Sequence, residues 1–357
     1  MSELIPYLAR IDENRFYTNF GPLTEELRIR LGGELRVDPA KVVLANSGTT
    51  ALCAAILSVS PDRSDDRGVA LVPSYTFPAT ALAAELCGYK PVVLDVDQET
   101  WGLEPGRVRE ELTKHKARLV VVVTPMGRSL DQAPWIDFQD TTGVPVVIDA
   151  AAGFENIIAD PKQHLGVLPT AVSFHATKAF TTAEGGCVVV DDVALADRAN
   201  SVINFGFRNG RVTEATGLNG KLSEYHAAIG LASLDTWAER RENVLAIGSG
   251  YEKQFAELGA PGRLWTTPTV ASNYVLYEAP TIGHAELVRD RLSDNNVGTR
   301  DWYAPGLHRQ EHFMTRSSGS YTTTDDLAAR FLGLPSAPDL EEREIKIVVS
   351  FLGDACL

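Results

Sequence analysis

The chain has 357 residues, of which 44% are hydrophobic and 22% are charged, a composition typical of a folded globular protein with two domains or one large domain. Its 33 basic and 47 acidic residues give a net charge of -14, which disfavours general binding to nucleic acids or anionic membranes because both are negatively charged. An anionic ligand must therefore meet hydrogen-bond donors that are placed locally.

The N-terminal segment becomes charged from Arg10 onward and lacks the apolar core of a signal peptide. No apolar run approaches the roughly 20 residues of a membrane span. The cysteines Cys53, Cys87, Cys187 and Cys356 are far apart and lack the spacing of a zinc site or a disulfide framework. We therefore expect a cytoplasmic protein with buried, reduced thiols and no metal site.

Short hydrophobic runs alternate with longer helix-like stretches over the first two thirds of the chain. This alternation predicts a mostly parallel sheet flanked by helices, and the near-continuous hydrophobicity of the runs predicts strands buried on both faces. Strands are expected at Lys41–Ala45, Val69–Val72, Pro91–Asp95, Leu119–Thr124, Val144–Ile148, Ala171–Phe174 and Cys187–Val190. Helices are expected at Thr50–Leu57, Pro78–Cys87 and Glu104–Lys116.

The last third of the chain has its own pattern of elements. A stretch from Ser223 to Leu258 with few helix breakers predicts helices that leave the sheet. A strand is expected at Ser272–Tyr277, helices at His284–Asn295 and Asp339–Leu352, and a loop-rich stretch at Val297–Tyr321. The predicted fold class is α/β, with a large domain and an N-terminal arm over residues 1–240 and a smaller C-terminal α/β domain over residues 241–357.

The segment Asn46–Leu52 follows a predicted strand and opens a predicted helix. Backbone N–H groups and hydroxyls in this position can bind phosphate, because the N-terminus of a helix attracts anions. An ordinary helix cap explains the same serine and threonine residues, so both interpretations stay open. The segment is not a Walker A loop, since no Gly-Lys pair follows, and the chain contains no Gly-x-Gly-x-x-Gly fingerprint.

Two further strand ends carry side chains suited to chemistry. Asp149 ends the run Val144–Ile148, where a carboxylate is costly to bury without a cationic partner such as a protonated pyridine nitrogen. A capping aspartate is the alternative interpretation. Lys178 follows the strand Ala171–Phe174 among apolar and small residues, so it can be desolvated and its amine freed for imine chemistry. An ordinary solvated lysine is the alternative there.

At these residues the chain resembles the DegT/DnrJ/StrS family of sugar aminotransferases, which depend on pyridoxal 5′-phosphate (PLP) and have the aspartate-aminotransferase (type I) fold. The resemblance covers nearly the whole chain. It rests on ordered matches at Asn19–Leu23, Ser47–Leu52, Pro73–Thr80, Asp95–Asp97, Asp149–Ala151, Ser173–Gly186, Gly217–Glu224 and Val297–His308. It implies that the large domain binds PLP.

The resemblance also implies roles for the cofactor-binding residues. Lys178 would hold PLP as a Schiff base and move a proton between the substrate and the cofactor. Asp149 would pair with the pyridine nitrogen, and Phe77 would stack on the ring. The phosphate would be held by residues of two elements, namely Gly48, Thr49, Thr50 and Ser173.

Residues matching the family's substrate and partner contacts lie later in the chain. Asn219 matches a position that in the family reaches the phosphate of the neighbouring subunit's cofactor, which implies a homodimer with shared active sites. Arg300, Tyr303 and His308 match a loop near the nucleotide-sugar in relatives.

Two segments depart from the family's pattern. Most relatives place Gln or His after the equivalent of Asp149–Ala151, where it touches the cofactor's phenolic oxygen, but this chain has Ala152. The contact is therefore absent or supplied elsewhere. The family's usual His-Leu-Tyr-Gly is here Thr124–Gly127, with Pro125 at its second position, which removes a histidine and an aromatic ring from the substrate side. Both changes affect the expected acceptor more than the use of PLP.

The function implied is a PLP-dependent aminotransferase for deoxyamino-sugar and polysaccharide biosynthesis. L-Glutamate or glutamine would donate the amino group, and a nucleotide-linked keto-sugar would accept it. The lysine at position 178 disfavours the family's dehydratases, which carry histidine there. A transaminase acting on a non-nucleotide carbonyl compound, such as a cyclitol ketone, is one alternative, and a PLP-binding regulatory protein is another.

Overall fold

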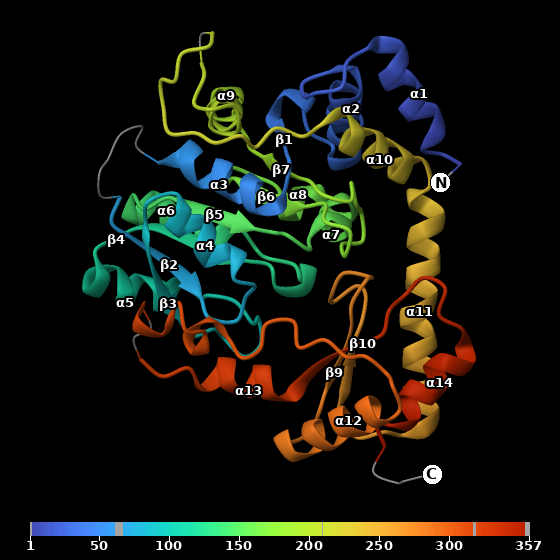
Figure 1. Cartoon of the computed structure of the whole chain (residues 1–357). Coiled ribbons are helices and arrows are strands. Elements are labelled where there is room, and N and C mark those ends of the chain that lie inside the picture. The colour runs from blue at the N-terminus through green and yellow to red at the C-terminus, as the bar shows by residue number, and fades with distance from the viewer. Residues whose placement is uncertain (1, 61–66, 209, 317–318, 354–357) are drawn as a thin grey trace.

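The computed structural model describes residues 2–60, 67–208, 210–316 and 319–353. Figure 1 shows a large sheet with its helices, a smaller sheet beneath it, and a long helix, α11 (Trp237–Leu258), that runs along one side of both. Within these described ranges, no helix is both long and apolar enough to cross a bilayer. The two sheets confirm the predicted α/β fold class.

The large sheet has seven strands in the order β1-β7-β6-β5-β4-β2-β3. Strand β7 is antiparallel to both of its neighbours, and the remaining pairs are parallel. The strands are β1 (Val42–Ala45), β2 (Val69–Pro73), β3 (Lys90–Leu94), β4 (Ala117–Val123), β5 (Val146–Asp149), β6 (Thr170–Ser173) and β7 (Gly186–Val189). All seven predicted strands are therefore present, shifted by at most two residues at either end.

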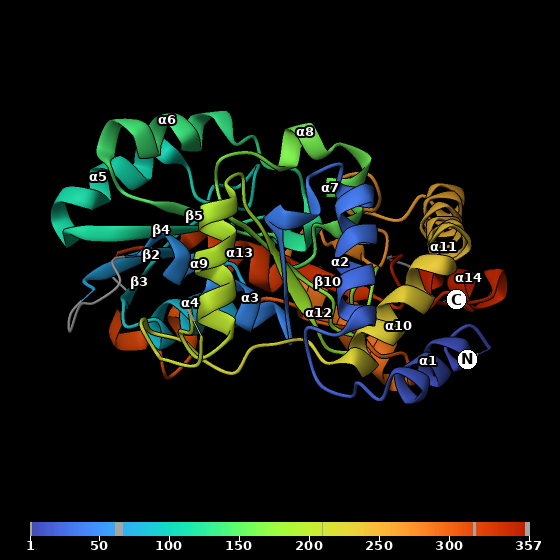
Figure 2. The same cartoon turned by 90° about the horizontal axis from the view of Figure 1, so that it is seen from above.

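Helices cover both faces of this sheet, as Figure 2 shows from above. One face is covered by α3 (Gly48–Val59), α4 (Ala79–Leu86) and α9 (Val193–Ile203), and the other by α2 (Pro22–Leu35), α5 (Pro105–His115), α6 (Ala133–Thr142) and α7 (Phe154–Ala159). Alternate strand residues enter the two cores, since Val120 packs on one face and Val121 on the other. Burial on both faces explains the near-continuous hydrophobic runs.

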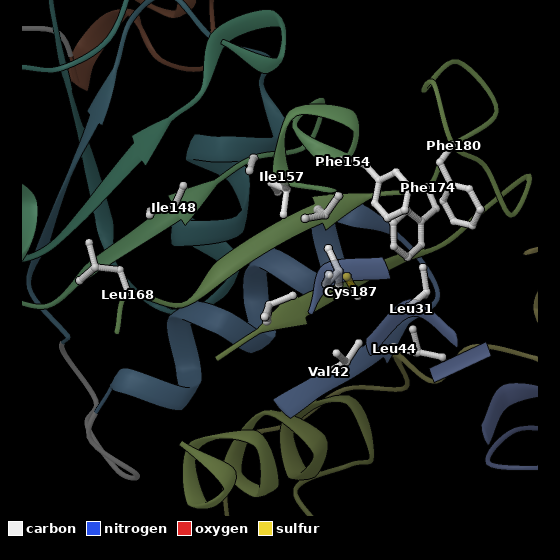
Figure 3. Packing of buried hydrophobic residues seen from close by; sticks show 14 of the residues in the cluster. Leu31, Val42, Leu44, Ile148, Phe154, Ile157, Leu168, Phe174, Phe180 and Cys187 are labelled. Atoms are coloured by element: carbon white, nitrogen blue, oxygen red, sulfur yellow. The ribbon is translucent and has the colours of Figure 1, made fainter. Parts of the chain in front are cut away.

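A cluster of aromatic rings lies just beyond the carboxyl end of β6, where Phe174 follows the strand. Phe154 stacks on Phe180 with ring centroids 4.6 Å apart, and Phe174 meets Phe180 edge-on at 5.0 Å. Figure 3 shows these rings beside Cys187 of β7. Cys53, Cys87 and Cys187 are free and buried, as predicted, whereas Cys356 lies outside the described residues.

The C-terminal part begins with α10 (Glu224–Asp235), on which the N-terminal helix α1 (Ile5–Asn14) packs, and continues into α11. The predicted boundary near residue 240 falls inside α11, so it marks no loop, and the division into two domains stays a prediction. The second sheet is antiparallel, in the order β10-β9-β8. Its elements are β8 (Arg263–Trp265), β9 (Val275–Glu278), α12 (Ile282–Asp294), α13 (Thr322–Arg330), β10 (Phe331–Leu334) and α14 (Glu342–Ser350).

The described residues also form one short helix, α8 (Pro161–His164), and the 3-10 turns η1 (Pro39–Lys41), η2 (Pro125–Gly127), and the pair η3 (Leu307–Arg309) and η4 (Met314–Arg316). The last pair lies within the stretch Val297–Tyr321, which was predicted to be rich in loops. No clear sequence pattern predicts β8, β10 or α13, because each is short and only β10 is buried throughout.

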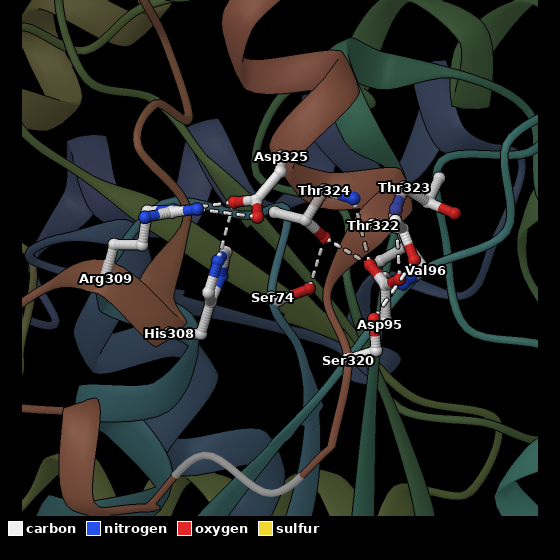
Figure 4. A network of polar contacts seen from close by, with 10 residues as sticks. All are labelled: Ser74, Asp95, Val96, His308, Arg309, Ser320, Thr322, Thr323, Thr324 and Asp325. Carbon is white, nitrogen blue, oxygen red and sulfur yellow. Dashed lines mark hydrogen bonds and ion pairs between the residues drawn. The ribbon is translucent and has the colours of Figure 1, made fainter.

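A carboxylate of the large domain caps a helix of the C-terminal part. The N-cap of α13, Tyr321, makes no side-chain capping bond. Asp95, just beyond β3, instead accepts hydrogen bonds from the backbone N–H of Thr323 at 3.1 Å and of Thr324 at 2.9 Å, and from the Thr324 hydroxyl at 2.7 Å (Figure 4). Asp95 thus ties α13 to the edge of the large sheet, because it satisfies N–H groups that the helix itself leaves without partners.

This contact generates a prediction for stability. We expect Asp95→Ala to lower the free energy of unfolding by about 1–3 kcal/mol, because it leaves buried donors without an acceptor. The partly buried Asp97 makes similar bonds to the backbone N–H groups of Glu99 and Thr100 within one turn, so Asp97→Ala is the matched control and should cost less. Urea denaturation of both variants measures the free energies of unfolding. Equal losses in the two variants would show that the contact between Asp95 and α13 stabilises the protein no more than a local turn does.

Candidate active site

A cavity of about 330 Å³ lies beyond the carboxyl ends of β4, β5 and β6. In parallel sheets this edge is where ligands bind, and the volume suits a small organic molecule. The large domain lines it with residues that include Gly48, Thr49, Thr76, Phe77, Thr124, Asp149, Ala152, Ser173, His175, Lys178 and Glu184. The C-terminal part contributes three aromatic side chains, Tyr274, Trp302 and Tyr303.

The N-terminus of α3 forms an anion seat at one end of the cavity. Ser47 caps the helix, and its hydroxyl accepts a hydrogen bond from the N–H of Thr50 at 3.1 Å. The helix provides no internal partner for the N–H groups of Gly48 and Thr49. A Cβ atom on Gly48 would lie 2.6 Å from Cβ of Ser173, at the end of β6, so glycine is required for this close approach. Both interpretations of this segment therefore hold, because Ser47 caps the helix while the neighbouring Gly48 and Thr49 keep N–H groups that can bind a phosphate.

Thr50 does not line this cavity, although it was predicted to hold the phosphate. Its hydroxyl lies 2.9 Å from that of Ser47. Its methyl group lies close to Gly220, where an added Cβ would meet it at 2.3 Å. Of the four residues predicted to hold the phosphate, Gly48, Thr49 and Ser173 therefore line the cavity.

Asp149 reaches the floor of the cavity from the end of β5. One carboxylate oxygen accepts a hydrogen bond from the Thr80 hydroxyl at 2.7 Å, and the other accepts one from the N–H of Ala151 at 3.1 Å. Burial raises the pKa of Asp149 above its ordinary value, and these two hydrogen bonds oppose the rise. A buried carboxylate of this kind favours a cationic partner within the cavity.

Lys178 lies in the loop after β6, on the same cavity. Its amine donates a hydrogen bond to the Tyr274 hydroxyl at 3.3 Å, and its own backbone N–H donates to the carbonyl of His175 at 2.9 Å. The lysine is partly buried, and its positive charge opposes the rise in the pKa of Asp149. The structure thus brings the predicted amine and the predicted carboxylate to one cavity.

Phe77 also lines the cavity but leaves 60% of its surface exposed. An aromatic ring so exposed is unusual for a core residue, and it is free to stack on a flat ligand. The position fits the predicted stacking role, and Thr76 beside it bonds the Thr80 hydroxyl at 2.8 Å, so the same turn supports Asp149.

The predicted partner contact lies outside the cavity. Asn219 is exposed, and its side-chain oxygen accepts a hydrogen bond from Lys221 at 2.7 Å while its carbonyl accepts one from Asn46 at 3.2 Å. Its exposure leaves it available to another molecule, and its role at a neighbouring site stays a prediction.

The three predicted substrate residues have different positions. Tyr303 lines the cavity, and its hydroxyl accepts a hydrogen bond from the N–H of Met126 at 3.3 Å. Arg300 is exposed and pairs through its backbone with Gly333. His308 stacks on Tyr321 at 4.2 Å and bonds Asp325 at 2.9 Å (Figure 4). Neither Arg300 nor His308 is among the described residues that line this cavity.

Sequence patterns did not predict three residues at the site, namely Tyr274 and Trp302, which line the cavity, and Thr80, which lies behind Asp149. Thr80 supports Asp149, Tyr274 bonds the amine of Lys178, and Trp302 meets Tyr274 edge-on at 5.1 Å. Tyr274 lies within the predicted strand Ser272–Tyr277, and Trp302 lies between the predicted Arg300 and Tyr303. No local pattern marks these residues, because long-range folding brings them to the site.

The chemical groups of the cavity fit one kind of ligand. Helix N–H groups and a serine hydroxyl suit a phosphate, a buried carboxylate suits a ring cation, and an amine suits an aldehyde. The glycine at position 48 lets the N-terminus of α3 approach Ser173 closely, since any Cβ there would meet Ser173, so the helix N–H groups and the serine hydroxyl lie at one end of the cavity. PLP carries a phosphate, a pyridine ring and an aldehyde, so the residues present fit this cofactor.

Comparisons with known proteins agree with this arrangement. Residues 1–353 match the model of the DegT/DnrJ/EryC1/StrS aminotransferase family. Protein Rv3402c of Mycobacterium tuberculosis (strain ATCC 25618 / H37Rv) is 32% identical over 99% of this chain and 87% of its own length. The dTDP-4-amino-4,6-dideoxy-D-glucose transaminase of Shigella dysenteriae is 28% identical over 98% of this chain and 95% of its own length.

A solved structure is similar throughout. The crystal structure of DesI in the presence of its TDP-sugar product superposes with a TM-score of 0.87 and 30% sequence identity. The match covers 98% of this chain and 89% of the DesI chain. The chain is therefore similar along almost its whole length to a protein whose sugar product was observed with it.

The buried carboxylate generates a prediction for the protein free of PLP. Because burial raises the pKa of Asp149, the folded state holds this proton more tightly than the unfolded state, where the pKa is about 3.9. Its contribution to stability is therefore lost as the pH rises through the interval above that value. We expect Asp149→Asn to gain stability relative to the wild-type protein as the pH rises from about 4 to about 8.

Thermal unfolding across this pH range tests the prediction. The control is Asp137→Asn, which alters a carboxylate with 69% of its side chain exposed and paired with Arg109. Its difference from the wild-type protein should stay within about 0.5 kcal/mol. Parallel pH profiles for Asp149→Asn and the wild-type protein would contradict the prediction.

Proposed function

The chain belongs to the DegT/DnrJ/EryC1/StrS aminotransferase family, and on this premise we propose that it transfers an amino group from L-glutamate or L-glutamine to a nucleotide-linked keto-sugar. The enzyme is a PLP-dependent aminotransferase of the sugar aminotransferase family. The finer proposal concerns its donor and acceptor, and it places the reaction in the biosynthesis of deoxyamino sugars.

One observation carries the proposal, namely that Lys178 and Asp149 share a cavity whose far end is an anion seat. A transaminase needs an amine that can take and return a proton, and a carboxylate that keeps a ring nitrogen charged. Asp149 ends β5, and Lys178 lies in the loop that follows the neighbouring parallel strand β6, so both reach the same edge of the sheet.

Bound PLP supplies an aldehyde that bonds amines and a ring that draws electrons away from the bond to the α-hydrogen. Asp149 would hold the positive charge at the ring nitrogen, helped by Thr80. The N–H groups of Gly48 and Thr49 and the hydroxyl of Ser173 would bind the phosphate, and Phe77 would cover one face of the ring.

Lys178 would act as acid and base in both halves of the reaction. Its Nζ atom would take the proton from the α-carbon of the amino donor and deliver it at the neighbouring reacting carbon. In the second half the same atom would move a proton in the reverse direction, toward the carbon of the acceptor. The lysine lies on the cavity wall that faces Tyr274, so the protons would move on that side.

The acceptor side of the cavity is aromatic. Tyr274, Trp302 and Tyr303 form a wall from the C-terminal part of the chain. The apolar C–H faces of a sugar ring can pack on such rings, which supports a sugar acceptor. The relatives named for dTDP-sugars favour a nucleotide-linked acceptor, while the departures from the family's pattern at Ala152, which lines the cavity, and at Pro125 leave room for a different carbonyl compound.

We further propose a cytoplasmic homodimer with shared active sites. Asn219 and Phe77 are both exposed near the large sheet, and exposed residues of this kind are available to a second copy of the chain. Size-exclusion chromatography with light scattering would test the dimer. Lys178→Ala and Asn219→Ala subunits can also be mixed. If the sites are shared, each mixed dimer has one site with an intact Lys178 from one subunit and an intact Asn219 from the other, and activity should return.

Lys178→Ala should lower the rate of the half-reaction with glutamate by at least about 10³-fold, because the proton acceptor is lost. It should also remove the visible band of the covalently held cofactor, which borohydride fixes to the wild-type chain. Lys162→Ala, on the short surface helix α8, is the control and should retain both. A retained, borohydride-fixable band in Lys178→Ala would sink the assignment of this lysine.

An acceptor panel then tests the finer proposal. After L-glutamate has bleached the band of the wild-type protein, nucleotide-linked keto-sugars and free cyclitol ketones are offered in turn. Return of the band with a nucleotide-linked sugar supports the proposed acceptor. Return only with cyclitol ketones would replace it by the alternative.

The anion seat generates a separate prediction. Gly48→Ala should weaken PLP binding by about 10- to 100-fold, because the new methyl group meets Ser173 at 2.6 Å and displaces one side of the seat. Gly33→Ala is the control, since a Cβ there has open space on the exposed face of α2. Equilibrium titration of the PLP-free proteins measures the affinity, and equal affinities in the two variants would contradict the seat.

A further inference from the structure

The segment Ala271–Tyr274 lies against the large domain although it belongs to the C-terminal part of the chain. The N–H of Ala271 donates to the carbonyl of Met126 at 2.9 Å, and the N–H of Ser272 donates to a carboxylate oxygen of Glu155 at 2.7 Å. Three of these four residues are buried. The segment is therefore held on the large domain before it enters β9.

Its last two residues contact two consecutive residues of the lysine loop. The side-chain amide of Asn273 donates to the carbonyl of Thr177 at 2.8 Å. The hydroxyl of Tyr274 lies 3.3 Å from Nζ of Lys178. Through these two hydrogen bonds, the segment holds both the backbone just before the lysine and the lysine amine.

The ring of Tyr274 has little freedom. It is 3% exposed, meets Trp302 edge-on at 5.1 Å, and packs in one buried cluster with Ala152 and Met126. The hydroxyl is consequently held at a defined point of the cavity wall. Among the described residues, it is the only side chain that hydrogen-bonds the Lys178 amine.

A phenolic hydroxyl suits an amine that changes its protonation state. The hydroxyl can accept a hydrogen bond from an ammonium group and donate one to a neutral amine. A lysine has four rotatable side-chain bonds and loses much conformational freedom when it is held. A fixed partner therefore keeps the amine in place during the interval in which it is not bonded to the cofactor.

We propose that Tyr274 is a positioning residue that holds the freed amine of Lys178 over the cavity between the steps of transamination. The proposal rests on the proposed function only in that Lys178 is taken as the proton carrier. Asn273 supports the same task by holding the carbonyl of Thr177, one residue earlier. Tyr274 thereby acts through Lys178, and no bond to it forms or breaks.

Tyr274→Phe tests the proposal, because it removes the hydroxyl and keeps the ring that packs on Trp302. Tyr277→Phe is the matched control, since this tyrosine lies in the same small domain and its hydroxyl bonds the carbonyl of Pro261 at 2.8 Å, away from the cavity. Both variants should unfold at temperatures close to that of the wild-type protein. A large loss of stability in Tyr274→Phe alone would overturn a purely positioning role.

The first readout needs neither amino donor nor acceptor. PLP is mixed with the PLP-free protein, and the growth of its visible band reports how fast the amine bonds the aldehyde. We expect this rate to fall about 3- to 10-fold in Tyr274→Phe at unchanged final occupancy, because the amine samples more orientations. An unchanged rate would overturn the proposal.

The second readout separates positioning from binding. In the half-reaction with L-glutamate, the maximal rate of Tyr274→Phe should fall about 10-fold while the concentration for half-saturation stays the same. The isotope effect with α-deuterated glutamate should rise, because proton transfer becomes more limiting. A change in half-saturation with an unchanged maximal rate would instead make Tyr274 a donor-binding residue.

The two readouts also separate this proposal from the proposed function. If no nucleotide-linked sugar restores the band, the acceptor proposal fails, but the loading rate still tests Tyr274. If the loading rate is unchanged while sugar transfer proceeds, the positioning role fails and the transaminase proposal stands.

Discussion

The burial of the Asp149 carboxylate at the end of β5 is the constraint around which the site is organised. Removing this charge from water is unfavourable, and burial accordingly raises the pKa of the group. Two hydrogen bonds, from Thr80 and Ala151, offset part of the cost. The apolar cores that cover both faces of β5 stabilise the fold enough to offset the remaining cost of the buried carboxylate. A cationic ligand removes the conflict, so the arrangement is suited to a cofactor with a charged ring.

The cavity depends equally on how the C-terminal part is joined to the large domain. Asp95 caps α13, and Trp101 of the large domain meets Trp265 at 4.8 Å and Phe331 at 4.9 Å. These contacts place Tyr274, Trp302 and Tyr303 opposite the strand ends. The proposed catalytic groups therefore come from β5 and from the loop after β6, and the wall that faces them comes from the C-terminal part of the chain. This division lets the acceptor wall change while the cofactor anchors stay fixed.

The sequence predicted the large sheet well because burial on both faces leaves a signal in every strand. It also pointed to Asp149 and Lys178, since Asp149 ends β5 and Lys178 lies in the loop after β6, and their roles stay predictions. It could not predict Tyr274, whose bond to Lys178 joins residues 96 positions apart. His308 is the opposite kind of example, a residue that was predicted at the site but lies outside the cavity. It bonds Asp325 and stacks on Tyr321. Local patterns predict strands and their ends, but side-chain contacts between distant loops are set by packing.

The charge of the cavity bears on how an anionic substrate could be held. Among the described residues that line it, the basic side chains are Lys178 and His175, and His175 lies 3.5 Å from Glu184. Lys178 is the residue proposed to carry the proton, and the hydroxyl of Tyr303 already accepts a bond from Met126. Glutamate and a nucleotide diphosphate both carry negative charge, and the whole chain is negative at -14. We therefore expect the carboxylates or phosphates of the substrates to meet donors from outside this cavity. A second copy of the chain is the simplest source of such donors, so the proposed acceptor and the proposed homodimer depend on each other.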